Sequence, residues 1–120
     1  MSEIIINVKK IGQSNSITLV KVEGSLDAHT VPNFENKMNE LINAGNYKIL
    51  IDAEGINYIS SAGLGIFMSI LDTVEENGGS LSVMKATEQF SKVFAMMGFD
   101  DLFASYSNEE EAIAGISGKN

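Results

Sequence analysis

Residues 48–65 read KILIDAEGINYISSAGLG and join a short apolar run to the start of a helix. The run at residues 49–51 is Ile-Leu-Ile, which is typical of a strand buried on both faces, as in a parallel sheet. From Gly63 onward, apolar residues recur at helical spacing, with Leu64, Phe67 and Leu71 on one face. The stretch therefore predicts a buried strand, a junction that contains two serines, and an amphipathic helix.

The chain before this stretch predicts a hairpin and a helix. Residues 3–8 and 17–22 are rich in β-branched and apolar residues, and the polar residues 9–16 between them favour a turn. Residues 30–43 have apolar side chains at helical spacing. Pro32 falls in the first turn of this helix, where its missing N–H is tolerated, and Gly45 is a plausible stop.

The chain after this stretch alternates again between strand and helix. Two glycines at residues 78–79 end the helix, and residues 80–85 predict a strand. Thr87 is the expected N-cap of the next helix, and Gly98 fits the position just beyond its C-cap. A short segment near Leu102 precedes a last helix, for which residues 107 and 110 (Ser and Glu) have the spacing of a capping box.

This order of elements predicts an α/β fold. Strands that alternate with helices imply right-handed crossovers and a partly parallel sheet, to which the hairpin adds an antiparallel pair. We therefore expect one domain over residues 1–120, a mixed β-sheet with an N-terminal hairpin and about four helices packed on it. Residues 116–120 are expected to fray, and Leu50, Phe34, Met38 and Phe67 are expected to be core residues.

Composition excludes several classes of function. The chain has no cysteine, which rules out disulfides, thiolate metal sites and cysteine nucleophiles. Its net charge of −8 and its lack of arginine disfavour nucleic acids and anionic membranes as direct partners. A basic protein partner fits, although acidity alone can serve solubility. Without a visible signal sequence or a run of about 20 apolar residues, we expect a cytoplasmic protein.

The two adjacent serines, Ser60 and Ser61, are the strongest candidates for chemistry. A serine at a helix start is a natural N-cap, so a purely structural role is one interpretation. Gly63 and Gly65 lie where a helix favours alanine by about 1 kcal/mol each. Such glycines indicate close approach by another backbone, either from this chain or from a partner.

The same region resembles a known family. Residues 56–65 are similar to the phosphorylation-loop motif of STAS-domain anti-sigma factor antagonists, and residues 23–27, EGSLD, are similar to the family's Gly-x-Leu-Asp signature. The resemblance covers essentially the whole chain and implies that Ser61 is the phosphorylated residue. It also implies a partner-binding surface at Asp27, Ser60, Ala62, Gly63 and Leu64. Many members have aspartate immediately before the modified serine, where this chain has Ser60.

The resemblance further implies a mechanism of partner switching. The unphosphorylated antagonist would bind an anti-sigma factor that is also a serine kinase, and this binding would release the sigma factor. Phosphorylation would end the complex, and a PP2C-type serine phosphatase would restore it. No catalytic residue, cofactor or metal is implied, so the protein is expected to be a substrate and ligand and not an enzyme. The alternative is an unphosphorylated STAS scaffold or binding module in a transport or signalling assembly.

Other polar residues carry weaker signals. Asp27 either closes the loop before the helix near residue 30 or touches the kinase, and one residue can do both. His29 is the only histidine. Because no Ser-His-Asp set or Gly-x-Ser-x-Gly motif accompanies it, we expect an exposed loop residue, and a hydrolase that uses Ser61 is disfavoured.

Two acidic clusters and the methionines also have structural explanations. Residues 100–101 and 109–111 are acidic but lack an EF-hand pattern. The second cluster suits the N-terminal end of the last helix, where the helix dipole favours negative charge. Met68, Met96 and Met97 fall at apolar helical positions and are expected to be core residues, in part at an interface.

Overall fold

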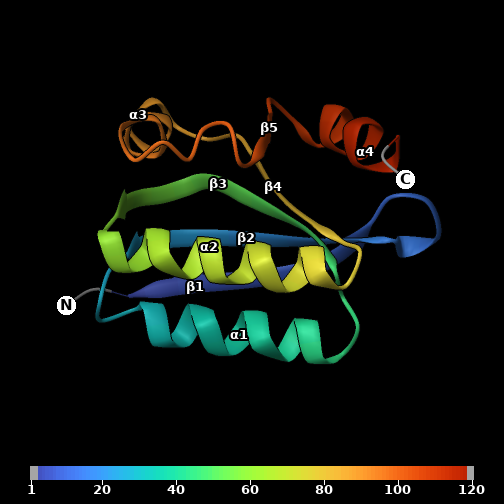
Figure 1. Cartoon of the computed structure of the whole chain (residues 1–120), viewed down its shortest axis with the longest axis horizontal. Helices are drawn as coiled ribbons and strands as arrows, with labels where there is room; N and C mark the ends of the chain where they lie inside the picture. Colours follow the sequence, from blue (N-terminus) through green and yellow to red (C-terminus); the bar gives the residue numbers. More distant parts are fainter. Residues whose placement is uncertain (1–2, 119–120) are drawn as a thin grey trace.

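The computed structural model describes residues 3–118, which form a five-stranded sheet with helices on both faces (Figure 1). The strands are β1 (Ile4–Ile11), β2 (Ile17–Leu26), β3 (Lys48–Ile59), β4 (Ser80–Met84) and β5 (Ala104–Tyr106). The helices are α1 (Val31–Asn43), α2 (Ser61–Glu76), α3 (Glu88–Met96) and α4 (Glu109–Ser117). This is the mixed sheet with a hairpin and four α-helices that the sequence predicts.

The strands follow one another across the sheet in chain order, β1-β2-β3-β4-β5. β1 and β2 are antiparallel, and every later pair is parallel. β3 is central, and Ile49, Leu50 and Ile51 have no solvent exposure, as the apolar run predicts. Because β2 and β3 are parallel, their carboxyl ends lie at the same edge of the sheet, where the loops that follow them meet.

One face of the sheet is covered by α1 and α2 (Figure 1). Phe34 and Met38 of α1 and Phe67 of α2 are fully buried there, as predicted. The Phe67 ring stacks on that of Phe34 with centroids 5.7 Å apart, and it meets the edge of Phe94 from α3 at 5.6 Å. Buried aromatic pairs of this kind stabilise a core beyond their burial alone, so α2 is held rigidly against the sheet.

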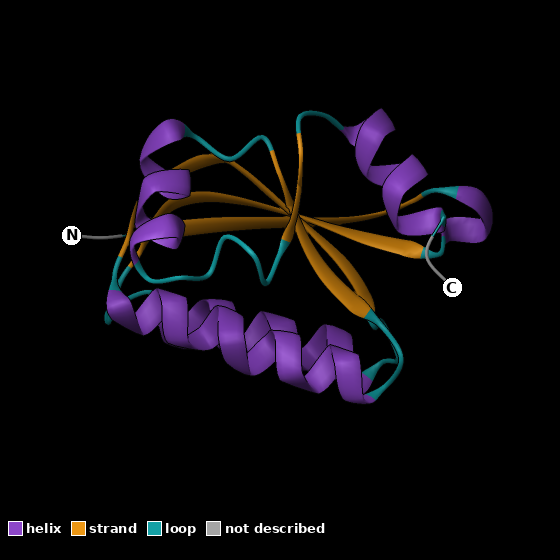
Figure 2. Cartoon of the chain, turned by 45° about the horizontal axis from the view of Figure 1, so that its top comes forward, coloured by secondary structure: helices purple, strands orange, loops and turns teal. Residues whose placement is uncertain are grey.

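The opposite face holds a second, smaller core. Leu50 packs there with Leu19 and Met84 of the sheet and with Ala112 and Ile116 of α4. Figure 2 shows α3 and α4 separated at opposite ends of the sheet. The last helix therefore covers only part of this face. No helix within residues 3–118 is both long and apolar enough to cross a membrane.

The strands are longer than the sequence predicts. β1 continues to Ile11, β2 to Leu26 and β3 to Ile59. The extension of β3 is maintained by parallel pairing with β2, with register shifts between Lys21 and Glu23 and between Gly24 and Ser25. These irregularities are typical of β-bulges. A bulge depends on pairing with a second strand, so the alternation of side chains along one strand does not reveal it.

The ends of the helices confirm some predictions and correct others. Thr87 caps α3, and Gly45 and Gly98 have the positive φ values typical of a residue just beyond a helix. The cap of α4 is Asn108 and not Ser107, because the Asn108 side chain accepts a hydrogen bond from the N–H of Glu111 at 2.9 Å.

The expectation that Met96 and Met97 are core residues is wrong. Met97 is 52% exposed because α3 ends before it, and Met96 is 84% exposed because α3 buries the face that carries Phe90 and Phe94. Met68, in contrast, is partly buried against the first core. Fraying from residue 116 stays a prediction; in the structure Ile116 is only 2% exposed and Ser117 is helical. Residues 119–120 of that prediction lie outside the described residues.

Candidate functional site

The predicted site lies at the carboxyl edge of the two long parallel strands. Leu26 and Ile59, the last residues of β2 and β3, are paired in register. Asp27 and Ser60 follow them directly. The backbone N–H of Ser60 donates a hydrogen bond to the Leu26 carbonyl at 2.8 Å, which fixes the start of α2 beside the β2–α1 loop.

Ser60 is the N-cap of α2. Its backbone is extended, and its Oγ accepts a hydrogen bond from the N–H of Gly63 at 3.3 Å. The side chain satisfies one of the N–H groups that a helix start leaves without a partner. Of the two serines, Ser60 therefore has the structural role, and its hydroxyl is already used inside the protein.

Ser61 is the first residue of α2 and is exposed. Its hydroxyl makes no hydrogen bond with another residue in the described part of the chain. The N–H groups of Ser61 and Ala62 precede the first intrahelical hydrogen bond and are left for solvent or a ligand. Ala62 and Gly65, two small residues of the same helix start, are exposed as well.

The two glycines of the motif differ in their surroundings. A Cβ at Gly63 would lie 2.9 Å from Ile59 Cγ1 and 3.0 Å from the Leu26 carbonyl oxygen, whereas a Cβ at Gly65 would meet nothing within 4 Å. Gly63 therefore permits a close approach inside this chain. Leu64 is buried too, so Gly63 and Leu64 position Ser61, and their contact with a partner stays a prediction.

Asp27 organises the neighbouring loop. Its Oδ1 accepts hydrogen bonds from the N–H groups of His29 at 2.9 Å and Thr30 at 3.1 Å. The Thr30 hydroxyl in turn donates to the Ser25 carbonyl at 2.5 Å. These contacts confirm that Asp27 closes the loop before α1, and His29 is exposed as expected. The contact of Asp27 with a kinase stays a prediction.

Two residues next to the site are not singled out by the sequence. Asn57 Oδ1 accepts a hydrogen bond from the Ser25 hydroxyl at 2.8 Å, which joins β2 to β3 near their ends. Tyr58 is 50% exposed and lines a small pocket with Gln89 and Val93 of α3. The signal that could have found them is the motif itself, because residues 56–65 include both positions.

The helix that carries Ser61 has an acidic surface. Asp72, Glu75 and Glu76 are exposed on α2, which has no lysine, whereas Lys37 of the neighbouring α1 pairs with Glu40 at 3.4 Å. Such a surface suits a partner with basic groups. Within residues 3–118, no group of three or more His, Asp or Glu side chains is placed to hold a metal ion.

Comparison with known proteins establishes the family. The STAS domain model matches residues 8–112. The chain therefore belongs to the STAS domain family, in the branch of the anti-sigma factor antagonists. An anti-sigma-B factor antagonist of Staphylococcus aureus (strain NCTC 8325 / PS 47) is 31% identical over 83 residues, which cover 69% of this chain and 77% of that protein.

Solved structures agree in fold. An anti-sigma factor antagonist from Mycobacterium paratuberculosis superposes with a TM-score of 0.83 at 20% identity, over 96% of this chain and 95% of that one. Unphosphorylated SpoIIAA, an anti-sigma factor antagonist, gives a TM-score of 0.80 at 21% identity, over 97% and 99% of the two chains. Its phosphorylated form from Bacillus gives 0.72 at 21% identity, over 93% and 99%.

Proposed function

We propose that this protein is an anti-sigma factor antagonist that is switched off by phosphorylation of Ser61. The unphosphorylated form binds an anti-sigma factor that is also a serine kinase, and the sigma factor is released. The kinase transfers the γ-phosphoryl group of ATP to the Ser61 hydroxyl, which loses its proton, and ADP leaves. A PP2C-type phosphatase hydrolyses the phosphate ester and restores the hydroxyl.

The observation that carries this proposal is the division of roles between the two serines. Ser61 is exposed and its hydroxyl is unengaged in the described chain, whereas the Ser60 hydroxyl caps the helix. A kinase can reach Ser61 without disturbing the fold. The start of α2 is held in place during phosphorylation by the hydrogen bond from the Ser60 N–H to the Leu26 carbonyl and by the buried Phe67 side chain.

The same position tolerates the phosphate once it is attached. A phosphate at residue 61 carries about −1.5 to −2 charges near neutral pH. The N–H groups of Ser61 and Ala62 and the positive end of the α2 dipole favour an anion there. The first turn of α2 contains no acidic residue that would repel it. Phosphorylation is therefore expected to leave the fold intact.

The partner, in contrast, would be expelled. A surface packed on Ser61, Ala62 and Gly65 approaches closely because these side chains are small, and a phosphate would fill that space. A like charge about 4 Å away, such as a nucleotide phosphate in the kinase site, opposes it by roughly 4 kcal/mol at an effective dielectric of 20. That corresponds to an affinity loss of nearly a thousandfold. Local repulsion is therefore sufficient for release.

The test is a phosphorylation reaction with the cognate anti-sigma factor and ATP, followed by mass spectrometry of the intact and digested protein. We expect one phosphate, on Ser61. The Ser61→Ala variant should bind the kinase but stay unmodified, and Ser60→Ala should still be phosphorylated once circular dichroism shows that it is folded. Phosphate on Ser60 or elsewhere would contradict the assignment of the site.

A second experiment distinguishes an anti-sigma factor antagonist from the alternative, an unphosphorylated STAS scaffold. Pull-down from the native cytoplasm should recover a protein with kinase activity, and the purified antagonist alone should not hydrolyse ATP. Recovery of a transport or signalling assembly without any kinase, together with an unmodified Ser61, would support the STAS scaffold instead. ATP hydrolysis that persists through purification and disappears in a point mutant would show an enzyme.

A further inference from the structure

The face of the sheet opposite Ser61's helix contains a second candidate site. A hollow of about 230 Å³ lies on this face next to the start of α4. Its lining comes from strands β1 to β4, from the residue after β4 and from α4. The lining residues are Asn7, Val8, Lys9, Leu19, Lys21, Asp52, Met84, Lys85 and Glu109.

Strand register explains why these residues meet. Asn7 pairs with Lys21, Lys21 with Asp52, and Asp52 with Met84, so one row of side chains crosses four strands. Lys9 pairs with Leu19 in the next row. The α4 helix covers this face only up to its first residue. The hollow is thus the part of the sheet that lies beyond the end of the helix.

The charge of the hollow differs from that of the rest of the protein. It has three lysines and two carboxylates, whereas the remaining chain has five lysines and fourteen carboxylates. Within residues 3–118, ion pairs closer than 4.0 Å form only at Lys37–Glu40 and Lys92–Glu88. The ammonium groups of the three lysines in the hollow are therefore not neutralised by a close carboxylate.

The carboxylate inside the hollow is held by the backbone. Asp52 is only 5% exposed, and its Oδ1 accepts a hydrogen bond from the N–H of Glu54 at 3.1 Å. Its remaining lone pairs and those of Glu109 can accept hydrogen bonds from hydroxyl or amino groups of a ligand. Three lysines nevertheless outnumber the two carboxylates, so the net charge of the hollow is positive and favours an anionic group on a ligand.

Lys85 adds a backbone observation. It has φ of 56°, a left-handed conformation that residues other than glycine seldom adopt, while its N–H is bonded to the Tyr106 carbonyl at 2.9 Å. Such conformations persist where the surrounding structure fixes them and recur at ligand-binding sites. Lys85 follows Met84 directly and lines the hollow together with Met84 and Leu19.

We propose that this hollow binds a small organic anion, namely a phosphate or carboxylate attached to a compact apolar body. The lysines bind the anionic group, and the apolar body lies on Leu19 and Met84. A volume of 230 Å³ equals the space of roughly eight waters at about 30 Å³ each. This is the scale of a small ring with one anionic group.

The test is an NMR titration of the full chain with phenyl phosphate as the probe. Phenol tests the apolar body without the charge, inorganic phosphate tests the charge without the body, and a short glutamate peptide tests an acidic protein segment. We expect saturable shifts for phenyl phosphate that centre on the amides of residues 9, 19, 21, 84 and 85, and weaker binding of the other three probes.

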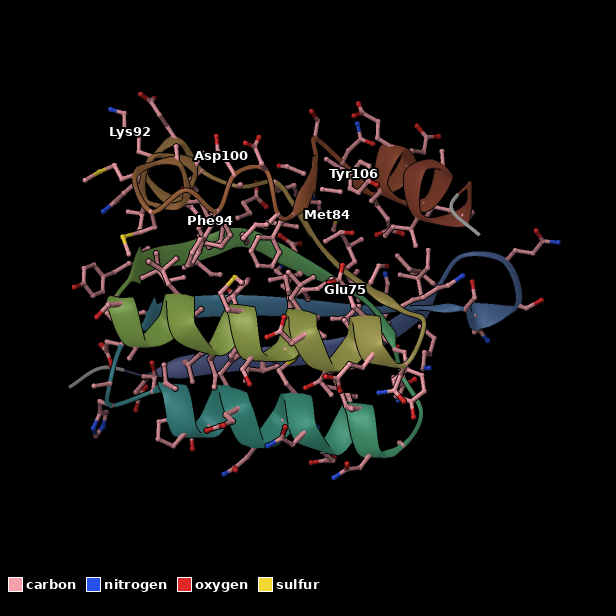
Figure 3. The ribbon with its side chains drawn as sticks, viewed as in Figure 1. Glu75, Met84, Lys92, Phe94, Asp100 and Tyr106 are labelled. Carbon is pink, nitrogen blue, oxygen red and sulfur yellow. The ribbon has the colours of Figure 1, made fainter. Side chains whose placement is uncertain are left out.

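Matched lysine variants complete the experiment. The double variant Lys21→Gln/Lys85→Gln should bind phenyl phosphate about tenfold more weakly, equivalent to ~1.4 kcal/mol. Lys92→Gln should bind as wild type, because Lys92 extends from α3 far from Met84 (Figure 3). The amide spectrum outside the hollow reports whether each variant is folded. Shifts that do not saturate, equal binding by the double variant, or equal or tighter binding of inorganic phosphate or the peptide would overturn the proposal.

Discussion

The helices α2 and α4 start in similar ways but carry different charge at their first turns. Each has a side-chain cap, since Ser60 accepts from the N–H of Gly63 at 3.3 Å and Asn108 from that of Glu111 at 2.9 Å. The first turn of α4 contains three glutamates at residues 109–111, and that of α2 contains no acidic residue. The positive end of a helix dipole is stabilised by negative charge. In α4 that charge is permanent, whereas in α2 we propose that a phosphate on Ser61 supplies it reversibly.

The largest expected effect comes from the core beneath α4. Leu50→Ala should destabilise the protein by about 2–5 kcal/mol, because it opens a cavity at a fully buried position. Leu50 packs with Ala112 and Ile116 of α4 and lies on the face away from α2. Denaturant unfolding measures the loss, and hydrogen exchange should show α4 loosened more than α2. An unchanged unfolding midpoint would contradict the packing of Leu50 in the second core.

The next largest effect is a difference in stability between alanine substitutions at the two glycines of α2. Gly63→Ala should destabilise by about 1–3 kcal/mol, because the added methyl group would meet Ile59 and the Leu26 carbonyl. Gly65→Ala, the matched control, should stabilise by up to about 1 kcal/mol, because its Cβ enters open space and alanine favours the helix. Thermal unfolding of both variants checks this. Equal shifts of the same sign would show that the close approach at Gly63 is unimportant.

The caps give smaller changes. Ser60→Ala and Asn108→Ala should each lose about 1 kcal/mol, since each removes the acceptor for an N–H group of the first turn. Ser61→Ala should change stability by less than about 0.5 kcal/mol, because Ser61 is exposed and caps nothing. Denaturant titration of the three variants ranks them. A larger loss for Ser61→Ala than for Ser60→Ala would reverse the roles of the two serines.

The smallest effect tests the difference in charge between the first turns of α2 and α4. Ser61→Asp should stabilise the free protein by about 0.3–1 kcal/mol at low salt, because it supplies α2 with a charge that its dipole favours. Glu110→Gln should lose a similar amount at α4. Both changes should shrink in high salt, which screens exposed charges. Destabilisation by Ser61→Asp would show that the start of α2 does not accept negative charge.

Much of the fold follows from the sequence. The apolar run at residues 49–51 and the helical spacing of Phe34, Met38 and Phe67 predict the central strand and the first core. The carboxyl end of β3 cannot be predicted from the sequence, because the second half of this strand is maintained by pairing with β2 and not by an apolar run. Helical spacing also fails for Met97, since periodicity does not show that α3 ends at Met96, and Met96 itself lies two residues from Phe94, off the buried face of the helix.

The site is predicted less completely. The motif at residues 60–65 identifies the junction between β3 and α2. The sequence alone does not show which of the two serines caps the helix. The choice depends on the hydrogen bond from the Ser60 N–H to Leu26, a residue far away along the chain. The hollow around Lys21 and Lys85 has no sequence signal at all, because its residues meet only through the strand register.

The central claim is that negative charge at Ser61, and not nearby, breaks the complex with the anti-sigma factor. The direct measurement is the dissociation constant of that complex by calorimetry, for wild type, Ser61→Asp and Ser60→Asp. The last variant keeps a capping side chain and places the same charge one residue away. We expect Ser61→Asp to bind at least about tenfold more weakly, a difference of ~1.4 kcal/mol, and Ser60→Asp to stay close to wild type. Binding of Ser61→Asp as tight as wild type, with both proteins folded, would contradict the account.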